Sequence, residues 1–161
     1  MKKIRKEYGV VAALFMALTM LFSSAALAGS YGKQKVVYHI NYDNPKQQAG
    51  ALRNVQNHIN AVGKENLDFK VVMHGKGLTL LLEPDAAANT KLKVGNATEK
   101  QQATISNLKD QGVTFSVCAN TLKGKKVKLD DLFDVTEGDI VPSGVAELSK
   151  LQQEGYTYIK P

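Results

Sequence analysis

The chain contains one cysteine, Cys118, and the residues around it suit a reactive thiol. Cys118 directly follows the β-branched and aromatic segment 113–117, which predicts that it ends a strand. A thiol attacks as its thiolate, and helix N-termini or nearby cations favour that form. If residues 119–122 begin a helical turn, their free N–H groups point toward the sulfur. Positive potential is also expected from the lysines that follow, Lys123, Lys125 and Lys126.

The sequence leaves two other roles open for Cys118. Free cysteine is among the most buried residue types, so the thiol could be packed in the core and inert. A single cysteine cannot form a disulfide within the chain, but in an oxidising compartment it could pair with a second copy. Relay chemistry requires the sulfur to stand at the rim of a sheet, exposed to solvent.

His74 is the second candidate, because it ends another expected strand and precedes a glycine turn, Gly75 to Gly77. It could orient a thiolate or bind an anionic group. Alternatively, it is a polar residue at the end of a strand. The glycine pair is too short for a phosphate-binding loop, and no Gly-Lys-Ser/Thr follows it, so nucleotide binding is unsupported. His39 and His58 are expected to be structural or to face solvent.

The sequence supports neither a metal centre nor a bound cofactor. One cysteine and three scattered histidines do not have the spacing of a zinc site. Flavin binding has only the analogy of the expected fold in its favour. The lysines outside the leader are scattered without interleaved aromatic residues, so nucleic-acid binding is not expected either.

Strand-like and helix-like segments alternate along the chain, and together they place the candidate residues. The clearest helix begins after Asn44, carries an apolar stripe from Leu52 to Val62 and ends at Gly63. A capping box is expected at Thr98 and Gln101, or at Asn96 and Glu99. Two further helices are expected, one ending near residue 111 and one following Ser143. The segment 78–82 could be a strand or a helical turn. The expected strands are residues 35–41, 68–74, 113–117, 139–142 and 156–160.

This alternation predicts the fold class. Strands joined through helices pair in parallel by right-handed crossovers. The sequence therefore predicts a flavodoxin-like three-layer α/β sandwich with a mostly parallel, five-stranded sheet. In such a sheet, ligands gather at the carboxyl ends of the strands, where both Cys118 and His74 are expected.

The N-terminus has the organisation of a cleaved signal peptide. Basic residues are followed by an apolar run, residues 10–22, and then by Ala26, Leu27 and Ala28, which predict cleavage after Ala28. The run is too short for a membrane anchor, so no stable membrane insertion is expected after cleavage. We expect a signal peptide at residues 1–28, one domain at residues 29–161 and a periplasmic location. Half of the formal charge of +6 belongs to the leader.

Three segments of the chain resemble the DsrE-like family, and in particular its exported branch. The first joins the helix that ends near residue 111 to the cysteine strand, the second begins at the end of the fourth strand, and the third includes the start of the glycine turn. Their matching residues are Leu108, Gly112, Val113, Phe115, Val117, Cys118, Asn120, Thr121 and Leu122, then residues 141–148, Leu151, Gln152, Gly155, Tyr156, Tyr158, Ile159 and Pro161, and lastly Val72, His74 and Gly75.

The resemblance implies a flavodoxin-like sandwich that assembles into a homo-oligomer, a trimer or a hexamer. It also implies that Cys118 carries sulfur as a persulfide between a donor and an acceptor, with His74 as an inferred neighbour. The leading hypothesis is a sulfur carrier or relay. The alternatives are a non-catalytic binding or assembly module with a structural cysteine, and a redox-sensing thiol that forms intermolecular disulfides.

Overall fold

The computed structural model describes residues 31–161, and within them five parallel strands form one sheet with the order β4-β3-β2-β1-β5. The strands are β1 (Gln34–Ile40), β2 (Leu67–Met73), β3 (Thr114–Cys118), β4 (Ile140–Val141) and β5 (Thr157–Ile159). The predicted three-layer α/β fold is confirmed, with all five strands parallel. The expected signal peptide lies outside the described residues. Within residues 31–161, no helix is both long and apolar enough to span a bilayer.

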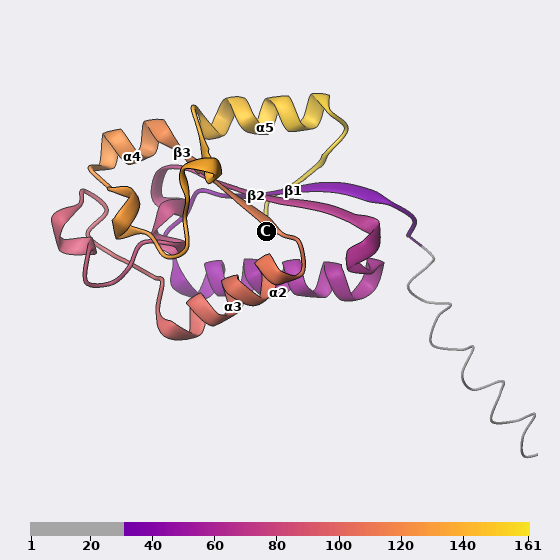
Figure 1. Cartoon of the computed structure of the whole chain (residues 1–161), viewed down its shortest axis with the longest axis horizontal. Helices are drawn as coiled ribbons and strands as arrows, with labels where there is room; N and C mark the ends of the chain where they lie inside the picture. The colour runs from indigo at the N-terminus through magenta and orange to yellow at the C-terminus, as the bar shows by residue number, and fades with distance from the viewer. Residues whose placement is uncertain (1–30) are drawn as a thin grey trace, which may run out of the picture.

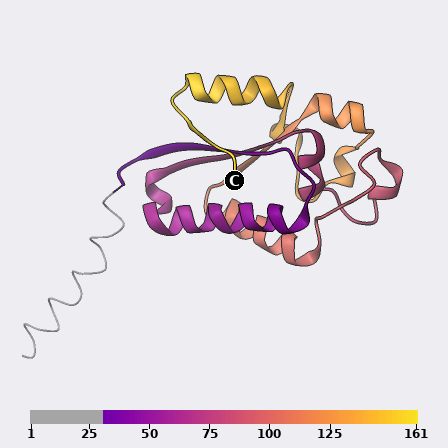
Figure 2. The ribbon, with the colours of Figure 1, turned by 180° about the vertical axis from the view of Figure 1, so that it is seen from behind.

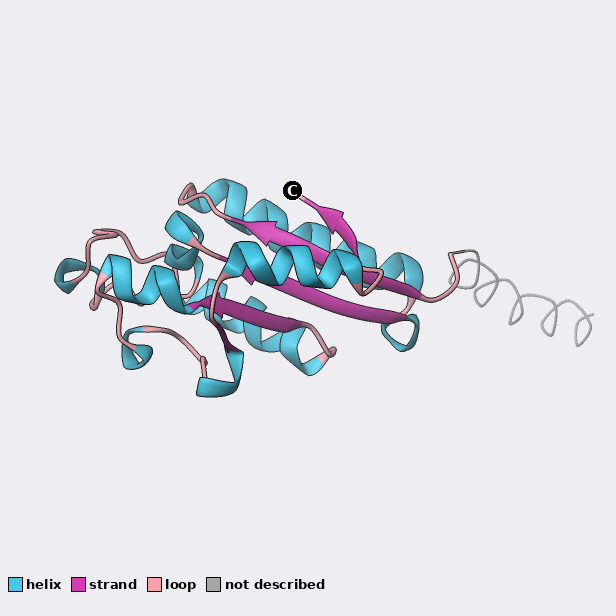
Figure 3. Ribbon diagram, turned by 90° about the horizontal axis from the view of Figure 1, so that it is seen from above, coloured by secondary structure: helices cyan, strands magenta, loops and turns pink. Residues whose placement is uncertain are grey.

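Helices cover both faces of the sheet, as Figures 1 and 2 show from opposite sides. The α-helices are α2 (Pro45–Val62), α3 (Glu99–Asp110), α4 (Ala119–Lys125) and α5 (Gly144–Gln153). The helices α2 and α3 lie on one face of the sheet, and α4 and α5 lie on the opposite face. Figure 3 shows the layers from above. The strand order reverses at β1, which has β2 on one side and β5 on the other.

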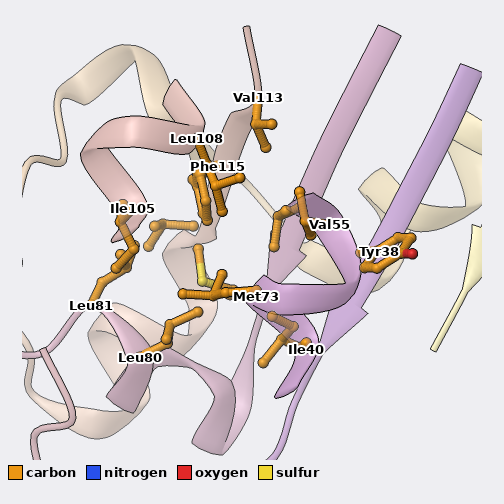
Figure 4. Packing of buried hydrophobic residues seen from close by; sticks show 14 of the residues in the cluster. Tyr38, Ile40, Val55, Met73, Leu80, Leu81, Ile105, Leu108, Val113 and Phe115 are labelled. Carbon is orange, nitrogen blue, oxygen red and sulfur yellow. The ribbon is translucent and has the colours of Figure 1, made fainter. Parts of the chain in front are cut away.

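Most of the apolar core lies between the sheet and the pair α2 and α3 (Figure 4). Alternate residues of β1, β2 and β3 enter this core, for example Tyr38 and Ile40 of β1 and Phe115 of β3. A smaller apolar cluster lies under α5, formed by Val37, Val72, Leu148, Leu151 and Tyr156. Successive residues of a strand point to opposite faces. The polar residues that alternate with the main core therefore face α5.

Two local expectations are settled by the structure. The segment after β2 is a 3₁₀ helix, Gly75–Leu80, rather than a strand, and Leu82 then forms an isolated antiparallel bridge with Leu132. All of Leu78, Leu80, Leu81 and Leu82 are buried, which explains why the run is apolar without a period. The expected capping box is not formed, because Thr98 is the N-cap of α3 but its side chain makes no capping hydrogen bond.

Candidate functional site

Cys118 is the last residue of β3 and the N-cap of α4, as the sequence predicts. Only 4% of its surface is exposed in the single chain. The expectation of a solvent-exposed thiol at the rim of the sheet is therefore wrong for this chain on its own. The covering element is α5, which approaches from 26 residues further along the chain and could not be placed over the sulfur from local sequence.

The groups that surround the Cys118 sulfur are polar hydrogen-bond donors. The backbone N–H groups of Gly144, Thr121 and Asn120 and the Thr121 hydroxyl lie near it and favour its anion, although the Cys118 side chain forms no capping hydrogen bond with the first turn of α4. That hydroxyl accepts a hydrogen bond of 2.9 Å from the Gly75 N–H, so its own proton is available to the sulfur. The turn after β2 thereby orients a donor that belongs to α4.

These donors set the ionisation of the thiol. Burial raises the pKa of Cys118, but the nearby donor groups of Gly144, Thr121 and Asn120 outweigh it, and the net pKa lies below its ordinary value. The predicted N–H groups at the start of α4 contribute to this shift. The lysines that follow are not among its causes, and a donor from α5 comes first among those that lower the pKa.

Gly144, the first residue of α5, permits this close approach. A Cβ atom at position 144 would lie 3.0 Å from the Cβ of His74 and 3.3 Å from the Cβ of Cys118. Ser143, the N-cap of α5, accepts a hydrogen bond from the Ala146 N–H and fixes the first turn of the helix. The absence of a side chain at Gly144 lets the first turn of α5, with its free N–H, lie close to Cys118.

His74 and Cys118 lie side by side on adjacent strands. Met73 of β2 pairs with Val117 of β3, so the next residues along the chain, His74 just after β2 and Cys118 at the end of β3, follow in register toward the same face. Within residues 31–161, however, no hydrogen bond joins the two side chains. The structure thus brings the two predicted residues together without showing His74 orienting the thiol.

His74 instead belongs to a row of hydrogen-bonded side chains that the sequence interpretation missed. Its Nε2 lies 2.8 Å from Nε2 of His39, and the two rings stack at 4.7 Å. Nδ1 of His39 lies 2.7 Å from the hydroxyl of Tyr158 on β5. The row thus joins the carboxyl ends of β2, β1 and β5, and Cys118 lies beside it at the end of β3.

Both histidines of this row are shifted toward their neutral forms. Burial, His74 and Lys160 together lower the pKa of His39 to about 4. Burial, followed by Lys160, lowers the pKa of His74. At neutral pH the pair is therefore uncharged, and each imidazole can both donate and accept a hydrogen bond.

A cleft of ≈ 580 Å³ opens beside this row, between α5 and the ends of β1, β2 and β5. Its floor is formed by His39, His74 and Tyr158. Its wall is formed by residues of α5, namely Val145, Leu148, Ser149, Gln152 and Gln153. Cys118 does not line the cleft, and His74 is the residue shared between the cleft and the surroundings of the sulfur.

The third histidine, His58, lies apart from this site. His58 is half-buried on the α2 face, where it bonds to Gln34 and approaches Tyr38. In the part of the chain that the structure describes, no group of three histidine, cysteine or acidic residues could hold a metal ion.

Comparisons with known proteins identify the family. The model of the DsrE/DsrF-like family matches residues 34–161. The chain is also similar to the solved structure of a protein of unknown function from Methanobacterium thermoautotrophicum, with 32% sequence identity and a TM-score of 0.63, over 80% of this chain and 100% of that one. No curated protein matches the chain. The family match over nearly all described residues shows that this chain belongs to the DsrE/DsrF-like family.

Proposed function

We propose that this protein carries sulfane sulfur as a persulfide on Cys118. The observation that supports the proposal is the set of donors around the sulfur, which favours its anionic form in spite of burial. Membership of the DsrE/DsrF-like family, which is generally related to sulfur relay, agrees with this role. A perthiolate on Cys118 is also an anion, so the same donors would stabilise the loaded state.

The proposed transfer conserves electrons at each step. The Cys118 thiolate attacks the outer sulfur of a donor persulfide and forms a new S–S bond. The S–S bond of the donor breaks, the outer sulfur stays on Cys118, and the inner sulfur of the donor leaves as a thiolate with the electron pair and takes a proton. An acceptor thiolate then attacks the outer sulfur of the Cys118 persulfide, and Cys118 leaves as a thiolate. No external oxidant or reductant is needed.

Intact mass after incubation with inorganic polysulfide tests the proposal. We expect wild type to gain about 32 Da, the mass of one sulfur atom, and a reducing thiol to remove it. Cys118→Ser should gain nothing, because the chain has no other cysteine. The proposal fails if the folded wild type gains no sulfur, or if Cys118→Ser gains as much.

A second candidate function is a non-catalytic assembly module in which Cys118 is structural. The 4% exposure of the thiol favours this reading. It predicts that the sulfur is inert toward small reagents until the protein unfolds, which is the opposite of the result expected for a carrier.

We also propose that the carrier acts in the periplasm as a homo-oligomer, a trimer or a hexamer. The organisation of residues 1–28 supports export, and the family resemblance supports assembly. The mature protein isolated from the periplasmic fraction should begin at Gly29, as intact mass would show. A protein that keeps Met1 and stays in the cytoplasm would contradict the location.

A further inference from the structure

The row formed by Tyr158, His39 and His74 has no part in the persulfide chemistry of Cys118, yet it forms the floor of the cleft under α5. Of these side chains, His39 is 7% exposed and Tyr158 is 39% exposed. The row therefore connects a buried titratable group with the open side of the cleft. The hydrogen-bonded side chains can therefore pass a proton between the buried imidazole of His39 and the open side of the cleft.

The geometry of the row allows it to accept one proton without losing a hydrogen bond. The contact of 2.8 Å between Nε2 of His39 and Nε2 of His74 requires one shared proton. In the neutral pair, one of the two Nδ1 atoms is also unprotonated. One added proton fills that position and leaves the shared contact intact. A second added proton would place N–H groups against each other and break the contact.

Protonation also changes what Tyr158 offers to the cleft. When His39 carries a proton on Nδ1, this N–H donates to the Tyr158 oxygen at 2.7 Å. The Tyr158 hydroxyl then has its own proton free, and it lines the cleft. A protonated row thus presents both a positive charge and a free O–H donor, which together suit an anionic acceptor.

The charged groups around the row favour an anion as well. No acidic residue lines the cleft. Lys160, beyond β5, is positive and lowers the pKa of both histidines. Cys118 on β3 is the other titratable neighbour. The charged residues of α5 and its end, Glu147, Lys150 and Glu154, are engaged in ion pairs with one another.

The size and the wall of the cleft indicate a small organic molecule rather than an inorganic ion. A volume of ≈ 580 Å³ is within the range of sites for organic ligands. Val145 and Leu148 provide apolar surface, whereas Gln152 and Gln153 offer amide donors and acceptors. A peptide-like compound with a carboxylate matches this combination.

We propose that the cleft binds a small, carboxylate-bearing thiol compound of about tripeptide size, and that the His39–His74 pair takes up one proton when it binds. Only the thiol group of this ligand rests on the proposed function of Cys118. The carboxylate and the uptake of a proton are inferred from the cleft and from the row of Tyr158, His39 and His74. A persulfide of such a compound would be a donor held beside His74, next to Cys118.

Isothermal titration calorimetry with S-methylglutathione, whose sulfur cannot exchange, tests this inference. In two buffers with different heats of protonation near pH 6, we expect uptake of about one proton per ligand. Binding should be about tenfold tighter near pH 6 than near pH 8, because the anion raises the pKa of the pair and protonation in turn favours the anion. The diethyl ester of the same probe, which lacks the carboxylates, should bind weakly without proton uptake.

Variants locate the proton. The double variant His39→Gln/His74→Gln should abolish proton uptake and flatten the pH dependence, because the amides keep polar partners in the row but do not titrate. His58→Gln is the matched control, since His58 is half-buried on the opposite face and its pKa is also lowered by burial. It should bind as wild type does. The inference is overturned if wild type does not bind the probe, binds it without proton uptake, or binds the ester equally well.

The result is separable from the proposed function of Cys118. Cys118→Ser should still bind the probe with proton uptake, although it takes no sulfur from polysulfide. Wild type that gains sulfur but does not bind the probe would overturn only the cleft inference. Wild type that binds the probe but gains no sulfur would overturn only the carrier function.

Discussion

Gly77→Ala is expected to lower the free energy of unfolding by about 3 kcal/mol or more. Gly77 is buried in the 3₁₀ helix after β2, and a Cβ atom there would lie 2.0 Å from the carbonyl oxygen of Ile40 at the end of β1. The His74 N–H bonds to that same carbonyl, at 3.4 Å. Neither backbone can withdraw without disturbing the carboxyl ends of β1 and β2, where the candidate site lies.

Urea denaturation monitored by circular dichroism measures this effect, and Gly124→Ala is its matched control. Gly124 lies in α4, and a Cβ atom there would meet nothing within 4 Å. Alanine at this helical position should be neutral or stabilise the protein by up to about 1 kcal/mol. If Gly77→Ala unfolds at the same urea concentration as Gly124→Ala, the close approach of the 3₁₀ helix to the end of β1 is not present in solution.

Gly144→Ala is expected to raise the pKa of Cys118 and slow its alkylation near neutral pH. The added Cβ would press on His74 and Cys118 at 3.0 and 3.3 Å, so the first turn of α5 must shift and its N–H moves away from the sulfur. Each unit by which the thiol pKa rises lowers the thiolate fraction, and with it the rate, by up to about tenfold at a pH below that pKa.

The pH profile of alkylation by iodoacetamide measures this change, with Gly138→Ala as control. A Cβ atom at Gly138 would make only an ordinary contact, 3.6 Å from Thr136. That variant should reproduce the profile of wild type. An unchanged profile for Gly144→Ala would show that the N–H of α5 does not stabilise the thiolate.

The sequence predicts those parts of the fold that depend on local patterns. The stripe from Leu52 to Val62 and the Asn44 cap identify α2, whose N-cap bond from the Gln47 N–H to Asn44 Oδ1 is 3.0 Å. Alternating strands and helices predict a parallel sheet, and the segment before Cys118 identifies β3. These features depend on neighbours a few residues apart, which a single sequence contains.

The row of side chains under α5 could be predicted only in part. The alternation in β1 places His39 on the face opposite Tyr38 and Ile40, and this signal could have distinguished it from a solvent-facing residue. Its contact with Tyr158 depends on β5 pairing with β1, and its contact with His74 depends on the register of β1 with β2. Local patterns contain neither the strand order nor the register.

The burial of Cys118 could not be predicted from the local sequence, because the N-terminus of α5 both covers the thiol and places a hydrogen-bond donor near it. Residue type alone could not decide between an inert core thiol and a reactive one. The structure combines elements of both, since the sulfur is shielded from solvent and yet surrounded by donors. The reactivity of the Cys118 thiol therefore distinguishes a sulfur carrier from a structural cysteine.

The rate of Cys118 alkylation as a function of pH, in the folded protein and in urea, tests the carrier account most directly. For the folded protein we predict a measurable reaction whose rate is half-maximal at a lower pH than in the unfolded chain. The thiol of the unfolded chain should have a pKa of about 8.5. A folded protein whose thiol stays inert at every pH, and reacts only as fast as the chain unfolds, would contradict the account.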